Sequence, residues 1–229
     1  MNNYWQEHFN LNSDRFENQL YKQVGKTVDG KEINEGQIDL IIAAIVNNLK
    51  LNQFDKVIDL CCGNGLLTKK ISLIVKEVVG VDFSKNLIGI AKLLNKAYNI
   101  GYNFEDILNL DSSFFKGQVK IFMYEGLQHL SPDDIYNVLS KLQISEGKQM
   151  LFIGGIPDKQ KLVKYYDTND KFNYYLQCEK EGRPHMGRWW NKDEITRIAA
   201  KTGFRATYLR QDSSLYTSYY RFDCVLEKI

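Results

Sequence analysis

The sequence predicts an α/β protein with a doubly wound, seven-stranded, mostly parallel sheet, a terminal antiparallel hairpin and a helical cap. Two observations carry this prediction. Short apolar runs alternate with amphipathic stretches over residues 56–156, and two further apolar runs near the end leave no room for a helix between them. Such alternation is typical of parallel sheets with right-handed crossovers. Because 229 residues suffice for one full core, we expect a single domain.

Each element has a local signal. Residues 4–25 have a helical pattern that breaks at Gly25 and Gly30, and residues 35–49 carry an apolar stripe at helical spacing. The predicted strands are 56–61, 77–81, one ending near Asp106, 119–124, 149–156, 204–210 and 219–226. The other predicted helices are 65–75, 85–97, 131–142 and 191–202, with N-caps at Ser84 and at Ser131, the latter followed by Pro132, and a capping pair of Asn191 and Glu194.

The elements divide the chain into four parts. We expect an N-terminal helical lid over residues 1–50 and an α/β core over 51–157, which holds the strand ends where a ligand would bind. Residues 158–190 are too long for a simple connection and are rich in tyrosine, which indicates an inserted helical cap. Residues 191–229 then form the C-terminal helix and hairpin.

Composition excludes several classes of protein. The formal net charge is only +2, with 30 basic and 28 acidic side chains, so no global field attracts nucleic acid or anionic lipid. No apolar run is long enough to span a bilayer, and the N-terminus lacks the pattern of a secretion signal. The four cysteines do not form a disulfide framework. We therefore expect a cytoplasmic monomer or homodimer without nucleic-acid or membrane partners.

The chemistry is expected where the parallel strands end. Gly63 and Gly65 follow the first strand and allow a tight turn close to a ligand. A nicotinamide site would need a third glycine where Thr68 stands, so the pattern favours a different nucleoside ligand. Asp82 ends the second strand, where an acid accepts hydrogen bonds from ribose hydroxyls. Glu105 and Asp106 end the third strand, where a carboxylate can accept a hydrogen bond from the amino group of an adenine.

Taken together, these residues resemble the class I S-adenosylmethionine-dependent methyltransferases, a family with a Rossmann-like fold, over about residues 56–156. The resemblance implies S-adenosylmethionine as cofactor and S-adenosylhomocysteine as product. It places the amino-acid end at Asp59 and the first loop, the ribose at Asp82 and the adenine beside Phe83. Cys61 stands where the family usually has glycine. The implied cofactor-binding residues are Asp59, Cys61, Cys62, Gly63, Gly65, Asp82, Phe83, Asp106, Ile107 and Tyr124.

A narrower resemblance lies outside the core. Residues 23–28, the turn 156–158 and residues 187–191 with Glu194 are similar to small-molecule methyltransferases of bacterial surface-polysaccharide clusters. The resemblance implies methyl transfer to an oxygen or nitrogen atom of a sugar or sugar nucleotide.

Five residues are candidates for handling this acceptor. His129 is the first candidate for a general base and Glu125 the second. Capping or packing at the start of the next helix is the more common role for a histidine such as His129, and Glu125 can equally contact the cofactor or the backbone. In the cap, Tyr165, His185 and Trp189 are candidates for binding the acceptor. Packing of the cap explains the aromatic residues equally well, and an exposed loop position explains His185.

Several other chemistries are disfavoured. No Pro-Pro-Tyr motif follows the fourth strand and no Pro-Cys dipeptide occurs, which argues against amino-methylation of adenine or glutamine and against the cysteine route to cytosine C5. One acid at the end of the fourth strand is too few for magnesium, so we expect no metal. An RNA or other macromolecule methyltransferase and a non-catalytic S-adenosylmethionine-binding protein remain the alternatives. A nicotinamide oxidoreductase ranks below both.

Overall fold

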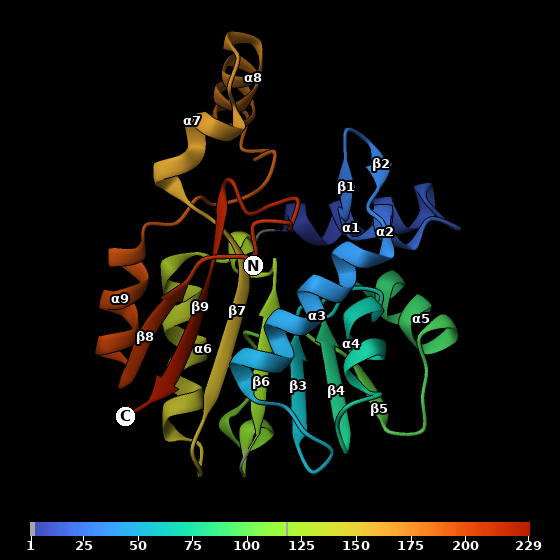
Figure 1. Ribbon diagram of the computed structural model, residues 1–229, viewed down its shortest axis with the longest axis vertical. Coiled ribbons are helices and arrows are strands. Elements are labelled where there is room, and N and C mark those ends of the chain that lie inside the picture. The colour runs from blue at the N-terminus through green and yellow to red at the C-terminus, as the bar shows by residue number, and fades with distance from the viewer. Residues whose placement is uncertain (1–2, 118) are drawn as a thin grey trace.

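A seven-stranded sheet forms the centre of the fold, which the computed structural model describes over residues 3–117 and 119–229 (Figure 1). Its strands are β3 (Lys56–Leu60), β4 (Glu77–Asp82), β5 (Ile100–Phe104), β6 (Lys120–Tyr124), β7 (Met150–Pro157), β8 (Phe204–Leu209) and β9 (Arg221–Lys228). Their order is β5-β4-β3-β6-β7-β9-β8. β9 is antiparallel to β7 and β8, and the other neighbouring pairs are parallel. The predicted fold class is therefore confirmed.

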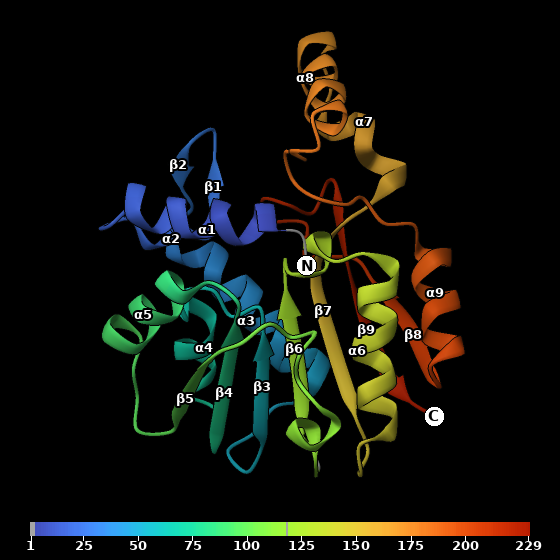
Figure 2. The same ribbon diagram turned by 180° about the vertical axis from the view of Figure 1, so that it is seen from behind.

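Helices cover both faces of this sheet (Figures 1 and 2). One face carries α3 (Glu35–Leu49), α4 (Leu66–Ile71) and α5 (Lys85–Leu94), and the other carries α6 (Pro132–Ile144) and α9 (Lys192–Lys201). Alternate strand residues serve the two layers: Val57 packs under α3 and α4, whereas Ile58 packs in the cluster of α6 and α9. None of the helices in the described ranges is long and apolar enough to cross a bilayer.

The remaining helices lie beyond the carboxyl edge of the parallel strands (Figure 1). They are α1 (Asn3–Arg15), α2 (Leu20–Gln23), α7 (Leu162–Tyr165) and α8 (Asn169–Lys180), with the short 3₁₀ helices η2 (Leu127–His129) and η3 (Lys159–Lys161) nearby. A third 3₁₀ helix, η1 (Ser112–Phe115), precedes β6 and belongs to the core cluster of α6. The helices α7 and α8 project farthest from the sheet and belong to the cap. A small hairpin of β1 (Thr27–Val28) and β2 (Lys31–Glu32) stands beside α2.

The predicted lid over residues 1–50 needs correction. Ile38, Ile41 and Ile45 of α3 are fully buried in the cluster that contains Phe122 and Phe152, so this helix belongs to the layer on the sheet. Only the part before α3 lies above the edge, and residues 1 and 2 of the predicted lid fall outside the described ranges. The four apolar residues of the α3 stripe explain the difference, because they need a sheet to cover them.

Three predicted helix boundaries also differ. The helix predicted over residues 4–25 is interrupted between α1 and α2, and α4 and α5 end earlier than residues 75 and 97. Asn99 Nδ2 donates to the carbonyls of Ser72 and Val75, at 2.9 and 3.1 Å, which holds the chain after α4 in a turn. Asn95 likewise ends α5 by donating to Asn64 O, at 2.8 Å.

One predicted cap is wrong. The side chain of Asn191 accepts no capping hydrogen bond at the start of α9. Glu194 instead forms an ion pair with Arg188, at 2.6 Å, because the chain leaving the cap brings that guanidinium beside the first turn of the helix. The N-caps predicted at Ser84 and Ser131 are confirmed, and Ser131 forms a full capping box with Asp134.

Candidate active site

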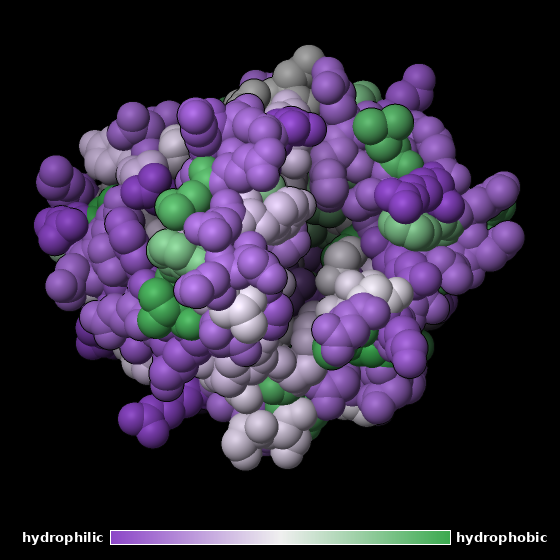
Figure 3. All heavy atoms as spheres, turned by 90° about the horizontal axis from the view of Figure 1, so that it is seen from above, coloured by the Kyte–Doolittle hydropathy of each residue, from purple (hydrophilic) through white to green (hydrophobic). Residues whose placement is uncertain are grey.

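A cavity of about 290 Å³ lies at the carboxyl edge of the parallel strands, beside the neighbouring strands β3 and β6 from which the strand order runs in opposite directions. Its walls come from the loops after β3, β4 and β6, the start of β9, α1, residues 24–27 and the cap. From above, Figure 3 shows a furrow between the cap side and the N-terminal side. Because open α/β sheets bind ligands at this position, the cavity is the candidate active site.

The loop after β3 follows a path that favours glycine. Gly63 and Gly65 have φ angles of 56° and 77°. A Cβ atom on Gly63 would lie 2.8 Å from Val24 Cγ1, and one on Gly65 would lie 2.4 Å from Tyr102 Oη. Cys61 also adopts a left-handed conformation, with φ of 61°, which costs a non-glycine residue about 1–2 kcal/mol. The turn predicted here is thus built close against its neighbours.

Two buried carboxyl groups flank this loop. Asp82 accepts hydrogen bonds from the N–H groups of Gly63 and Ser84, both at 2.8 Å, and its burial raises its pKa to about 6 despite these bonds. Asp59 accepts a hydrogen bond from Thr68 Oγ1, at 2.6 Å, and burial raises its pKa well above the usual range. Both side chains are therefore held rigidly at the cavity wall before any ligand arrives.

Helix α1 closes the side of the cavity next to Phe83. Gln6 Nε2 donates to Phe83 O, at 2.7 Å, and the ring of Phe9 meets the ring of Phe83 edge to face with centroids 6.3 Å apart. Asn10 anchors the same helix by accepting a hydrogen bond from Ser84 Oγ, at 2.7 Å. The N-terminal segment thus covers the turn that the sequence assigns to the nucleoside.

The structure brings most of the predicted cofactor residues together. Those that line the cavity are Asp59, Cys61, Cys62, Gly63, Asp82, Phe83 and Tyr124. Gly65, Asp106 and Ile107 are not among its lining residues. Asp106 Oδ1 accepts a hydrogen bond from Leu108 N, at 2.9 Å, so that carboxylate closes its own turn, while Ile107 is buried in the core.

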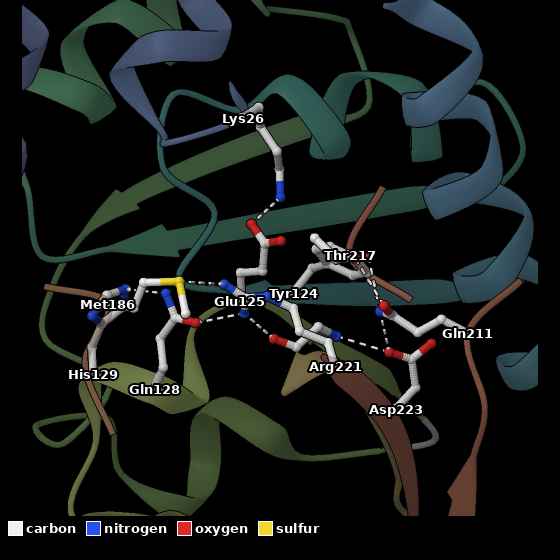
Figure 4. A network of polar contacts seen from close by, with 11 residues as sticks. Lys26, Tyr124, Glu125, Gln128, His129, Met186, Gln211, Thr217, Arg221 and Asp223 are labelled. Carbon is white, nitrogen blue, oxygen red and sulfur yellow. Dashed lines mark hydrogen bonds and ion pairs between the residues drawn. The ribbon is translucent and has the colours of Figure 1, made fainter. Parts of the chain in front are cut away.

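A buried ion pair occupies the wall after β6 (Figure 4). Glu125 has a φ angle of 55° and pairs through its carboxylate with Lys26 Nζ, which also lies 4.6 Å from the ring centroid of Tyr124. Burial alone would raise the pKa of Glu125, but Lys26 and Arg221 outweigh burial and hold it below its usual value. Burial lowers the pKa of Lys26, and Glu125 opposes that shift. Glu125 is therefore an ionised carboxylate.

Arg221 is a second buried cation, from the first position of β9 (Figure 4). Its Nη1 donates to Gln128 Oε1, at 2.6 Å, and to Gly155 O. Sequence reasoning missed Lys26, Gln128 and Arg221 as site residues. A signal existed for Arg221, since an arginine inside an apolar predicted strand needs a reason to be buried.

The family comparison agrees with this geometry. A family described as a methyltransferase domain matches residues 57–144, which run from β3 to the end of α6. Over these residues, the chain carries a methyltransferase domain. The predicted enzyme class and cofactor are thereby confirmed. No curated protein matches the sequence.

Solved structures share the whole fold of this methyltransferase. The cyclopropane synthase MmaA2 from Mycobacterium tuberculosis has a TM-score of 0.67 at 15% identity, covering 98% of this chain and 96% of its own. Magnesium protoporphyrin IX methyltransferase from Synechocystis has a TM-score of 0.62 at 16% identity, covering 98% and 95%. A methyltransferase from Anabaena variabilis has a TM-score of 0.61 at 20% identity, covering 99% and 94%.

His129 lies at the cavity of the methyltransferase in an aromatic environment. Its ring centroid is 4.2 Å from that of Trp5 and 5.3 Å from that of Phe9, both in α1. Burial lowers the pKa of His129 to about 3, and the positive charge of Arg221 adds to this effect. Within the described ranges its Nδ1 atom has no hydrogen-bond partner. The imidazole is therefore neutral and a weak base.

The cap contributes two of its three predicted residues to the cavity. Tyr165 and His185 line it, and His185 Nδ1 lies 3.2 Å from the hydroxyl of Tyr166. Trp189 is not a lining residue, because its ring packs in an aromatic cluster with Tyr166 and Tyr220. Packing thus accounts for Trp189, while the other two remain candidates for contact with an acceptor.

The two cysteines of the first loop and the possibility of a metal site remain to be considered. Burial raises the pKa values of the Cys61 and Cys62 thiols well above their usual range, so both are protonated. No group of three or more histidine, cysteine, aspartate or glutamate side chains in the described part of the chain is arranged to hold a metal ion.

Proposed function

We propose that this enzyme transfers a methyl group from S-adenosylmethionine to an oxygen or nitrogen atom of a small polar molecule, with a sugar or sugar nucleotide as the acceptor class. One observation carries the proposal: a single cavity is lined by the carboxyl groups of Asp59 in β3 and Asp82 in β4, and by charged and aromatic residues from the end of β6, the start of β9 and the cap. Donor and acceptor sites thus share one enclosed space. Magnesium protoporphyrin IX methyltransferase, which shares the fold, is named for a small-molecule substrate, and this supports the same class of acceptor here.

The residues around the first loop fit the cofactor. Asp82 has each carboxylate oxygen fixed by one backbone N–H, which leaves further lone pairs for the ribose hydroxyls. Phe83 offers a ring face for adenine, and Asp59 with the loop 61–65 would hold the amino-acid end. Tyr124 would lie at the boundary between donor and acceptor. Asp106 and Ile107 do not line the cavity, so they would contact the edge of the adenine only if the adenine reached past Phe83.

The bound cofactor supplies an activated methyl group on a sulfonium leaving group. A lone pair of the acceptor forms the new bond to the methyl carbon while the carbon–sulfur bond breaks, and its electron pair stays on sulfur. The protein aligns donor and acceptor and excludes water, which α1 and the cap do by covering the cavity.

A hydroxyl acceptor must also lose a proton. His129 and Glu125 are the two candidates for receiving it. Both are weak bases in this environment, since His129 is buried against aromatic rings and Glu125 is paired with Lys26. The geometry therefore favours an acceptor atom that needs little deprotonation, such as a neutral amine nitrogen or an oxygen that is already anionic.

Two other functions predict different behaviour. A macromolecule methyltransferase requires a basic surface, but the cap that lines the cavity together with α1 has nearly balanced charge, since residues 158–188 contain seven basic and five acidic side chains. A non-catalytic protein would bind the cofactor and transfer nothing.

The test is isothermal titration with S-adenosylmethionine and, separately, with NADH, followed by transfer of a tritiated methyl group. We expect binding of the former alone, and label in sugar nucleotides or other small metabolites. Label in total RNA would favour the macromolecular function. Cofactor binding without transfer to any fraction of a metabolite extract would favour the non-catalytic one, and no binding would refute the site itself.

A further inference from the structure

Arg221 is a buried cation without a direct ion-pair partner in the described part of the chain. The residue is only 5% exposed, yet no carboxylate in the described part of the chain lies within ion-pair distance of the guanidinium. The groups that its side chain contacts in the described part of the chain are neutral: Gln128 Oε1, the carbonyl of Gly155, the sulfur of Met186, at 3.9 Å, and Tyr220, whose ring centroid is 5.1 Å from the guanidinium carbon. Its Nε atom is buried and has no partner within the described ranges.

The nearby carboxylates are engaged elsewhere. Glu125 pairs directly with Lys26, and Asp223 accepts hydrogen bonds from Gly155 N and Gln211 Nε2, at 2.8 and 2.9 Å. Two cations therefore share a single cavity carboxylate on this side. In Figure 4, a dashed line joins Arg221 to Gln128, whereas the line from the Glu125 carboxylate leads to Lys26. Burial of a charge is costly unless an opposite charge and hydrogen bonds compensate it.

The other cavity carboxylates are too distant to compensate it. Asp59 and Asp82 belong to β3 and β4, whereas β9 lies three strands from β3 across β6 and β7. At about 4.8 Å between neighbouring strands, this separation is roughly 14 Å. The same distance sets Arg221 apart from the loop assigned to the cofactor, on the side of Tyr165, His185 and the cap.

We propose that Arg221 binds an anionic group, a carboxylate or a phosphoryl group, of the methyl acceptor. This inference rests on the proposed function and narrows its substrate class. The guanidinium lines the cavity and presents planar N–H donors that suit both kinds of anion. Its Nη2 donates to the sulfur of Met186, at 3.9 Å, which is a weak acceptor that an anion can replace. Arg221 would then decide which small molecules enter the cavity, by pairing with a charge that a neutral analogue lacks.

Two variants abolish the uncompensated positive charge in different ways, one by removing the guanidinium and the other by pairing it with a carboxylate. Arg221→Gln deletes the guanidinium and also its bonds to Gln128 and Gly155. Gln128→Glu keeps the guanidinium and places a carboxylate where Gln128 Oε1 now lies, 2.6 Å from Nη1. We expect Arg221→Gln to lower the Tm and Gln128→Glu to maintain or raise it. Arg205→Gln is the matched control, because Arg205 is exposed and pairs with Glu227, which lies at the opposite end of β9 from Arg221.

The experiment uses the full chain saturated with S-adenosylhomocysteine. Thermal unfolding is followed while sodium phosphate or sodium acetate is titrated at constant ionic strength against sodium chloride. For the wild type and Arg205→Gln, we expect one of the two anions to raise the Tm saturably beyond chloride. Both Arg221→Gln and Gln128→Glu should weaken the apparent affinity for that anion at least tenfold. The anion that binds identifies a phosphoryl or a carboxylate group as the recognised chemistry.

Cofactor affinity separates the ways in which the idea can fail. Unchanged affinity for S-adenosylhomocysteine in both variants supports an acceptor site. A tenfold loss of S-adenosylhomocysteine affinity in both variants would show that Arg221 binds the carboxylate of the cofactor. Anion affinity equal to that of the wild type in both variants would show that Arg221 has only a packing role. Either result overturns the inference. If the wild type does not bind S-adenosylhomocysteine, the proposed function fails, and the anion titration of the free protein still decides whether Arg221 is an anion site.

Discussion

The two sides of the cavity are built in different ways. The side next to β3 and β4 uses Asp59, Gly63 and Asp82, which lie within 24 residues of one another, and its Asp82 carboxylate is satisfied by backbone N–H groups. The side next to β6 and β9 joins Lys26, Glu125 and Arg221, which are far apart in the chain. The first side is a local device that needs only a strand and a turn. The second exists only when the N-terminal segment and the last strand have both docked.

The largest expected effect comes from breaking the buried pair on the second side. Lys26→Met leaves the Glu125 carboxylate buried beside one remaining cation, and we expect a loss of about 3–5 kcal/mol in the free energy of unfolding. Urea unfolding measures it. The double variant Lys26→Met/Glu125→Gln should recover much of the loss because the buried Glu125 carboxylate, which Lys26→Met leaves without its ion-pair partner, is then absent.

A matched surface pair provides the control for this prediction. Lys56 and Glu77 are 2.9 Å apart, but their side chains are 57% and 46% exposed, so Lys56→Met should cost at most about 1 kcal/mol. Equal losses in Lys26→Met and Lys56→Met would show that the two sides of the cavity do not differ in the way described.

The next effect concerns the first side and is read as cofactor affinity. Asp82→Ala removes the acceptor of two backbone N–H groups and of the proposed ribose contacts, and we expect S-adenosylhomocysteine to bind about 100-fold more weakly. Isothermal titration measures the change. Asp106→Ala is the comparison, with an expected loss below about tenfold because Asp106 does not line the cavity. The reverse ranking would move the nucleoside toward β5.

The pH dependence of binding sharpens the same assignment. Burial raises the pKa of Asp82 to about 6, so the carboxylate is ionised above that pH and protonated below it. Because the ionised form accepts the ribose hydrogen bonds, affinity should be constant above pH 6 and fall by up to about tenfold per pH unit below it. Titrations between pH 4.5 and 8 with wild type and Asp82→Asn test this expectation, since the variant should bind weakly at every pH and lose the dependence.

The smallest expected effect is on backbone strain in the first loop. Cys61→Gly relieves a φ angle of 61°, and we expect the free energy of unfolding to rise by about 0.5–1 kcal/mol after the entropy cost of glycine. Asp29→Gly is a suitable reference, since Asp29 has a φ of 49° in an exposed hairpin turn. A loss of stability in Cys61→Gly alone would show that the thiol's packing against Gly126 outweighs the strain.

Local patterns were enough to predict much of this protein. Short apolar runs and glycine turns predicted all seven strands of the sheet. The glycine loop and the acids at strand ends carried the family resemblance that implied the cofactor. The hairpin of β1 and β2 was missed although its Asp29-Gly30 turn is a strong hairpin signal. These features depend on neighbours in the chain, so a single sequence carries their signal.

The tertiary structure alone decided the environments of the charged side chains. Nothing local to His129 shows that Trp5 and Phe9 will bury it and lower its pKa to about 3. Nothing near Glu125 in the chain identifies Lys26 as its partner. Strand and turn formation follow from interactions over a few residues, whereas desolvation and ion pairing depend on which distant segments fold against a group. The sequence by itself therefore determined the fold and the cofactor class, and only the folded chain determined how the side of the cavity next to β6 and β9 is charged.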